Sequence, residues 1–148
     1  MQAVLIPVEL EDDMRIVDWY QLEDLQHHVG GFIEGIRYPT ASESKRDKIE
    51  WNQAGIPDFH DILPLINEEG KLLNLPFNIR ATLLMLPVLQ GDDYISGPML
   101  LVLANESGEE VSIPPAWWQP IGKSLAQTTK EAIATILVEQ TLASIPEQ

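Results

Sequence analysis

The chain has 148 residues, which suits a single domain and is long enough to bury a hydrophobic core. It carries 23 acidic and 9 basic side chains, a net charge of −14, and no cysteine. This acidity opposes direct binding to nucleic-acid backbones or anionic membranes, since both need clustered lysine and arginine. The lack of cysteine excludes disulfides, zinc–thiolate sites and a cysteine nucleophile.

No run of about 18 apolar residues occurs, so the sequence predicts no transmembrane helix. The N-terminal segment, residues 1–13, lacks the basic stretch and the small-residue cleavage site of a signal peptide. It has the pattern of a first strand instead. We therefore expect a cytosolic protein, in the cytosol of the host cell if a phage encodes it.

The N-terminal part alternates strand and helix patterns. Residues 3–10 predict a strand. An apolar stripe predicts a short helix over 19–29, with Asp18 as its N-cap and Gly30 as its C-cap. Residues 32–38 then predict a second strand, because apolar and polar side chains nearly alternate.

The middle of the chain is more irregular. Residues 39–58 show no periodic apolar face, and we expect them to form an inserted loop. Residues 62–75 predict a β-hairpin whose turn is the sequence NEEG. Asn78 is expected to cap a short helix that ends before Pro87.

The C-terminal part predicts two strands and the longest helix. The strands are expected over 94–104 and 111–113, and the helix over 119–143 with Pro120 at its first position. Together these elements predict one α+β domain with a mixed or antiparallel sheet of about five strands and two or three packed helices.

Two adjacent histidines resemble a metal site and two adjacent glycines resemble a phosphate-binding loop, and the sequence disfavours both interpretations. On a helix, the rings of His27 and His28 diverge by about 100°, whereas zinc sites use pairs spaced by one turn. Gly30 and Gly31 follow a helix and precede a strand, the reverse of the order in a phosphate-binding loop. We expect no metal site and no cofactor.

Two further features leave alternatives open. Glu34 shares a strand face with Phe32 and Ile36, so its carboxylate is either solvated or partly buried beside a cation. Trp117 and Trp118 either pack against the sheet and hold the terminal helix, or form an exposed aromatic anchor for a partner.

Three segments of the chain, taken together in order and spacing, resemble a family of unknown function, DUF3846. The segments are VGGFIEGI, NEEGKLLNLPFNIRAT and DYISGPMLLV. The resemblance covers about residues 3–104, with 39–58 as an insertion and 105–148 as a C-terminal extension. Members of that family occur in bacteriophages, plasmids and bacteria with mobile elements. The resemblance therefore implies a phage or mobile-element accessory protein, and it brings no established activity.

Most residues that match the family pattern have plain turn or capping roles. The matching residues are Gly30, Gly31, Glu34, Asn67, Glu68, Gly70, Lys71, Pro76, Asn78, Arg80, Ala81, Thr82 and Gly97. Glu34, Asn78 and Arg80 are the polar residues of this set that a role in a turn explains least. The sequence therefore predicts a binding pocket formed by these three.

Three hypotheses of function follow from these features. The leading one is a small acidic protein that binds a host protein, basic or nucleic-acid-handling, such as a defence protein, with carboxylates imitating DNA phosphates. The second is a protein or enzyme that binds a nucleotide or other anion, with Arg80 clamping its carboxylate or phosphate. The third is a homo-oligomer whose terminal helix forms the interface.

Overall fold

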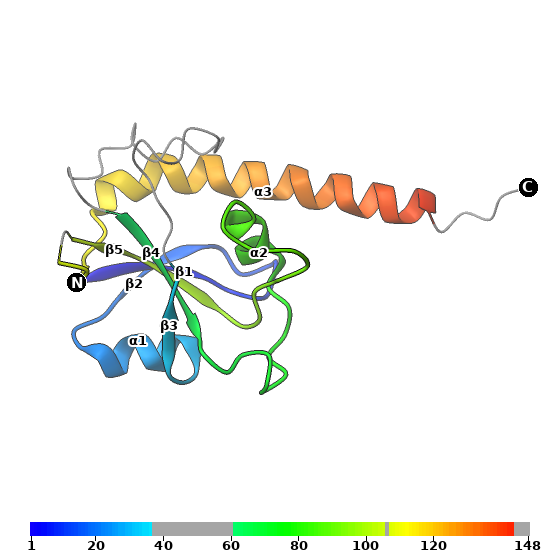
Figure 1. The fold of residues 1–148 in the computed structure, drawn as a ribbon. Helices are drawn as coiled ribbons and strands as arrows, with labels where there is room; N and C mark the ends of the chain where they lie inside the picture. Colours follow the sequence, from blue (N-terminus) through cyan, green and yellow to red (C-terminus); the bar gives the residue numbers. More distant parts are fainter. Residues whose placement is uncertain (37–60, 106, 144–148) are drawn as a thin grey trace, which may run out of the picture.

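The computed structural model of the protein describes residues 1–36, 61–105 and 107–143, and it has three layers (Figure 1). A sheet lies in the middle, with one helix below it and two helices above it in this view. This arrangement confirms the predicted α+β class. The loop predicted over 39–58 lies outside the described residues.

Among the described residues the sheet has six strands, and every pairing between them is antiparallel. The strands are β1 (Gln2–Ile6), β2 (Arg15–Asp18), β3 (Ile33–Gly35), β4 (Asp61–Asn67), β5 (Met99–Ala104) and β6 (Glu110–Val111). Their order across the sheet is β2-β1-β5-β4-β3, and β6 pairs with β5. Strand β5 is therefore central, which explains why it is apolar along its whole length.

In the part of the chain that the structure describes, three helices cover the sheet. They are α1 (Leu22–Val29), α2 (Ile79–Met85) and α3 (Pro115–Ala143). Helix α1 packs on one face, whereas α2 and the first half of α3 pack on the other (Figure 1). The second half of α3 extends beyond the sheet. Within the described residues, none of these helices combines the length and apolar character that crossing a bilayer requires.

Alternation along β5 divides the hydrophobic core into two halves. Met99, Leu101 and Leu103 point to the side of α2 and α3, whereas Leu100 and Val102 point to the side of α1. Successive side chains of a strand face opposite sides, so one central strand supplies both halves of the core.

Helix α1 confirms the predicted helix but has a different N-terminal cap. Gln21 stands at the N-cap, not Asp18, which belongs to β2. The Asp24 carboxylate accepts hydrogen bonds from the backbone N–H groups of Tyr20 and Gln21, at 2.8 and 3.1 Å, and these bonds lower the pKa of Asp24. The C-cap is Gly30, as predicted, with φ of 83°.

The predicted hairpin over 62–75 is wrong. Its first half is β4, but the chain then runs through turns at residues 68–74 instead of returning as a strand. The partners of β4 are β3 and β5, both distant in sequence. Leu72 and Leu73 are 84% and 54% exposed, so the apolar residues that suggested a second strand do not enter the core.

One strand and one helix start also differ from the sequence prediction. Strand β2 was not predicted: it has only four residues, and no element was assigned to residues 11–17. Helix α3 begins at Pro115 rather than at residue 119, so Pro115 and not Pro120 occupies the first helical position.

Candidate binding site

Asn78 organises the junction between α2 and the sheet. Its side chain is fully buried, and its Oδ1 accepts a hydrogen bond from the Ala81 N–H at 3.0 Å, which confirms the predicted N-cap. Its Nδ2 donates to the carbonyls of Ile6 and Gly97, both at 3.0 Å. These three bonds tie α2 to β1 and to the approach to β5, so Asn78 has a structural role.

Arg80 follows on the same helix and holds the loop between β1 and β2. Only 7% of the residue is exposed. Its Nη2 donates to the carbonyls of Pro7 and Glu9, at 2.9 and 2.7 Å. The backbone N–H of Asp12 in turn donates to the Glu9 carbonyl at 3.1 Å. The guanidinium thus fixes the shape of a loop that we call the acidic loop, residues 9–13.

Two opposing effects act on the pKa of Arg80. Burial lowers the pKa of its guanidinium, whereas the nearby carboxylates of Asp13, Asp12 and Glu11 act to raise that pKa. No ion pair joins Arg80 to them within the described residues. Its Nε is buried and has no hydrogen-bond partner there, which is an unfavourable arrangement that the two carbonyl bonds offset.

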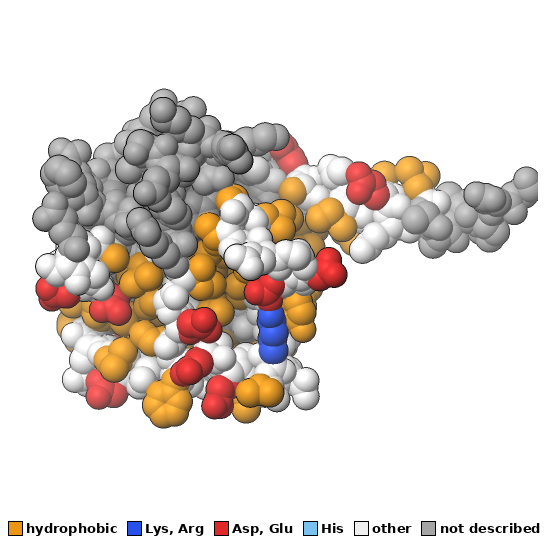
Figure 2. Space-filling view, viewed as in Figure 1, with side chains coloured by type: hydrophobic (Ala, Val, Ile, Leu, Met, Phe, Trp, Pro, Cys, Tyr) orange, Lys and Arg blue, Asp and Glu red, His pale blue; other side chains and the backbone are white. Residues whose placement is uncertain are grey.

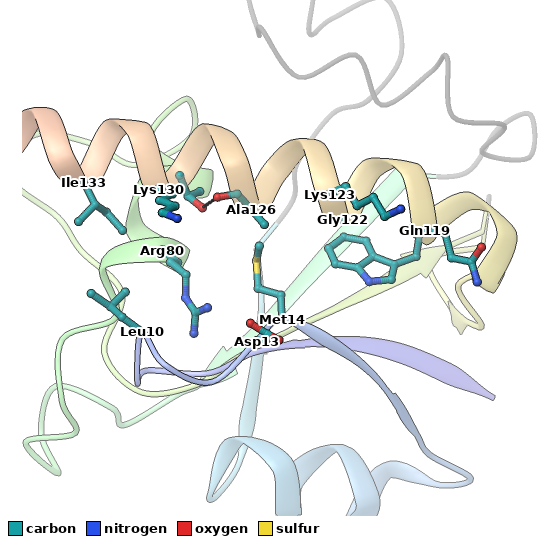
Figure 3. Close-up of a pocket in the computed structure, with 12 residues that line it drawn as sticks. Leu10, Asp13, Met14, Arg80, Gln119, Gly122, Lys123, Ala126, Lys130 and Ile133 are labelled. Atoms are coloured by element: carbon teal, nitrogen blue, oxygen red, sulfur yellow. Dashed lines mark hydrogen bonds between the residues drawn. The ribbon is translucent and has the colours of Figure 1, made fainter.

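A groove of about 770 Å³ lies between the acidic loop and α3 (Figure 3). Helix α3 forms one wall, and residues of the acidic loop face it together with Arg80. The lining residues are Leu10, Asp13, Met14, Arg80, Trp118, Gln119, Gly122, Lys123, Ala126, Thr129, Lys130 and Ile133. The volume and the mainly apolar lining with a few charged groups are typical of small-molecule sites.

Trp118 packs α3 against the sheet. It is 6% exposed and belongs to the core on the α2 and α3 side of the sheet. A Cβ atom added at Gly122, one turn along the helix, would lie 2.8 Å from Cε2 of the indole. Only glycine leaves room for the ring there. The buried alternative therefore holds for Trp118, whereas the side chain of Trp117 lies outside the described part.

The three polar residues singled out in the sequence do not form one pocket. Glu34 is exposed on β3 and lines a smaller pocket of about 370 Å³ with Lys71 and Asp93, where neither Asn78 nor Arg80 contributes. Arg80 lines the larger groove, and Asn78 lines neither. The three residues therefore share neither of these two pockets.

The described residues contain no group of three His, Cys, Asp or Glu side chains placed to hold a metal ion. His27 and His28 lie in the last turn of α1, where the ring of His28 is 3.4 Å from the carbonyl oxygen of Asp18. This position at the negative end of a helix gives both histidines an ordinary structural setting.

Lys123 and Lys130 are the groove residues that sequence reasoning missed. They are seven residues apart, which is about two helical turns, so they project from the same side of α3. That spacing is visible in the sequence. Its meaning is not, because only the folded chain brings Arg80 into the groove that the two lysines line.

Comparison with known proteins gives one match. A family model described as "Domain of unknown function (DUF3846)" matches residues 48–126, which include β4, α2, β5, β6 and the first turns of α3. No curated protein and no solved structure matches the chain.

Proposed function

Because the chain belongs to the family DUF3846, whose description assigns no activity, we propose that it acts by binding a protein partner. The partner is a basic host protein, and the chain is an accessory protein of a bacteriophage or another mobile element. The observation that carries this proposal is the acidic loop, which presents four carboxylates on a backbone that Arg80 holds in place.

The acidic loop is well suited to recognition. Glu9, Glu11, Asp12 and Asp13 are all exposed, and within the described residues none of them makes an ion pair. Because the loop backbone is already fixed through the carbonyls of Pro7 and Glu9, little conformational entropy is lost when a partner binds. A flexible run of acids would lose more.

The rest of the described surface supports the same conclusion. Figure 2 shows acidic side chains spread over the visible face, with little basic surface among them. The net charge of −14 attracts a basic partner at long range and raises the rate of encounter. In the finer form of the proposal, the partner handles nucleic acid or acts in defence, and the carboxylates occupy its phosphate-binding groups.

A pair of variants with equal charge tests this proposal. The loop variant carries Glu9→Gln, Glu11→Gln, Asp12→Asn and Asp13→Asn. The control variant neutralises four exposed glutamates elsewhere, namely Glu23, Glu68, Glu109 and Glu139. Wild type and control immobilised on beads should enrich the same bacterial protein, and the loop variant should lose it. A DNA oligonucleotide should release that protein if mimicry is correct. Equal enrichment by the loop variant would show that the acidic loop is not the interface.

Self-association through α3 is a second candidate, and one observation favours it. Beyond the body of the protein, Leu137, Val138 and Leu142 of α3 are 56%, 58% and 63% exposed (Figure 1). The helix carries two lysines and two glutamates, so its charge cancels while the chain as a whole carries −14. Two copies could therefore pair along α3 with little charge repulsion at the contact.

Sedimentation velocity distinguishes the two states. Under this second candidate, the wild type sediments as a dimer, and Leu137→Ser with Leu142→Ser gives a monomer of 16.6 kDa. The control pair Leu72→Ser and Leu73→Ser removes two other exposed leucines, 84% and 54% exposed and away from α3, and should leave the dimer intact. A wild type that is monomeric at every concentration tested rules the dimer out.

A further inference from the structure

The groove between the acidic loop and α3 collects unpaired positive charge. The described residues hold five basic side chains, Arg15, Lys71, Arg80, Lys123 and Lys130. Three of these, Arg80 and the two lysines of α3, line this one groove. The one ion pair among the described residues is that of Lys71 with Asp93, so none of the three groove cations has a carboxylate partner there.

Unpaired cations are unexpected in a chain that has an excess of 14 acidic charges. Carboxylates are abundant, and Asp13 lines the same groove, yet it makes no ion pair with any of the three. Arg80 uses only Nη2 in its bonds to Pro7 and Glu9, which leaves Nη1 without a hydrogen bond in the described part. The arrangement leaves donors available for a bound anion.

The remaining lining restricts the kind of anion. Leu10, Met14, Trp118, Ala126 and Ile133 give the groove a largely apolar surface, which favours a ligand with an apolar body. The acidic loop stands at one wall, and its carboxylates repel a ligand that carries several negative charges. One anionic head group beside the lysines satisfies both conditions.

We propose that this groove binds an amphipathic organic monoanion, with its head group among Arg80, Lys123 and Lys130 and its apolar body along α3 (Figure 3). The chemical class is a carboxylate or sulfonate on a hydrocarbon or aromatic body. This site adjoins the proposed protein interface, because Leu10 and Asp13 of the acidic loop line the same groove. Its ligand is held by the three cations and the apolar wall of α3, whereas the exposed carboxylates of the loop have no part in holding it.

Two fluorescent molecules that differ in charge provide the test. 8-Anilinonaphthalene-1-sulfonate is an aromatic monoanion, and N-phenyl-1-naphthylamine is its neutral relative. The groove variant carries Lys123→Gln and Lys130→Gln, and the control variant carries Arg15→Gln and Lys71→Gln, which removes the same charge outside the groove. Both lysines of the groove variant are exposed, so the variant is expected to fold.

The sulfonate is expected to bind the wild type, and its Kd should rise about fivefold to tenfold in the groove variant, since two charged contacts are lost. Its Kd in the control variant, and the Kd of the neutral molecule in both variants, should stay within about twofold. No sulfonate binding to the wild type, an unchanged Kd in the groove variant, or an equal loss in the control variant would each overturn the proposal.

Discussion

Replacing Asn78 with alanine is expected to lower the free energy of unfolding by about 3 to 5 kcal/mol. The change removes the N-cap of α2 and leaves the Ala81 N–H without its acceptor. It also leaves the buried carbonyls of Ile6 and Gly97 without their donor. Each buried group that loses its partner costs about 1 to 3 kcal/mol. Urea unfolding followed by circular dichroism measures the loss.

Asn105 supplies the control for this experiment. Its Oδ1 also accepts backbone hydrogen bonds, from Ser107 and Glu109 at 3.0 Å each, but in a solvated turn. Asn105→Ala should therefore cost less than about 1 kcal/mol. If Asn78→Ala were as mild as Asn105→Ala, the junction of α2 with the sheet would not depend on this side chain.

The second large effect is expected at Trp118. Trp118→Ala should destabilise the protein by about 3 to 5 kcal/mol, because it removes the indole ring that packs α3 against the sheet and leaves a cavity beside Gly122. Trp118→Phe keeps an aromatic ring and should cost clearly less. The same urea titration measures both variants.

Tyr20 is the matched surface aromatic, since it is 79% exposed. Tyr20→Ala should change the unfolding free energy by about 0.5 kcal/mol or less. Equal stability of Trp118→Ala and Tyr20→Ala would contradict the burial of Trp118 and would restore the alternative that this segment is an exposed anchor.

Local signals in the sequence predicted the helices well. Gly30 in the left-handed region and Asn78 before an apolar stripe each mark a helix end by chemistry within a few residues. The 3.6-residue period of α3 was equally visible. Its true start at Pro115 was missed, because the single helical turn before residue 119 is too short to show a periodic pattern.

Strand pairing was predicted less well, because it depends on contacts between distant residues. The segment after Asn67 has the turn residues of a hairpin, yet β4 pairs with β3 and β5 instead. The local preference for a hairpin is small, and the burial of β4 between two strands outweighs it. Strand β2 was missed for a similar reason: it gains its stability from pairing with β1.

At the binding site, too, local features were predictable from the sequence and long-range contacts were not. Arg80 could be picked out as a polar residue that turns do not explain, but its hydrogen bonds reach Pro7 and Glu9, 73 and 71 residues away. No local sequence pattern predicts contacts between residues so far apart in the chain. Glu34 was grouped with Arg80 because both match the family pattern and neither is explained by a turn, yet Glu34 lines a different pocket.

The central claim is that the acidic loop sets the rate at which this protein meets a basic partner. The most direct test is the association rate with the captured partner, measured by surface plasmon resonance for wild type, loop variant and control variant. Charges are screened over about 30 Å at 0.01 M salt and about 8 Å at 0.15 M. We predict that the wild-type association rate falls steeply between these salts, and that the loop variant associates more slowly than the control at low salt, with a smaller change in dissociation. An association rate that ignores both the salt and the loop substitutions would contradict the claim.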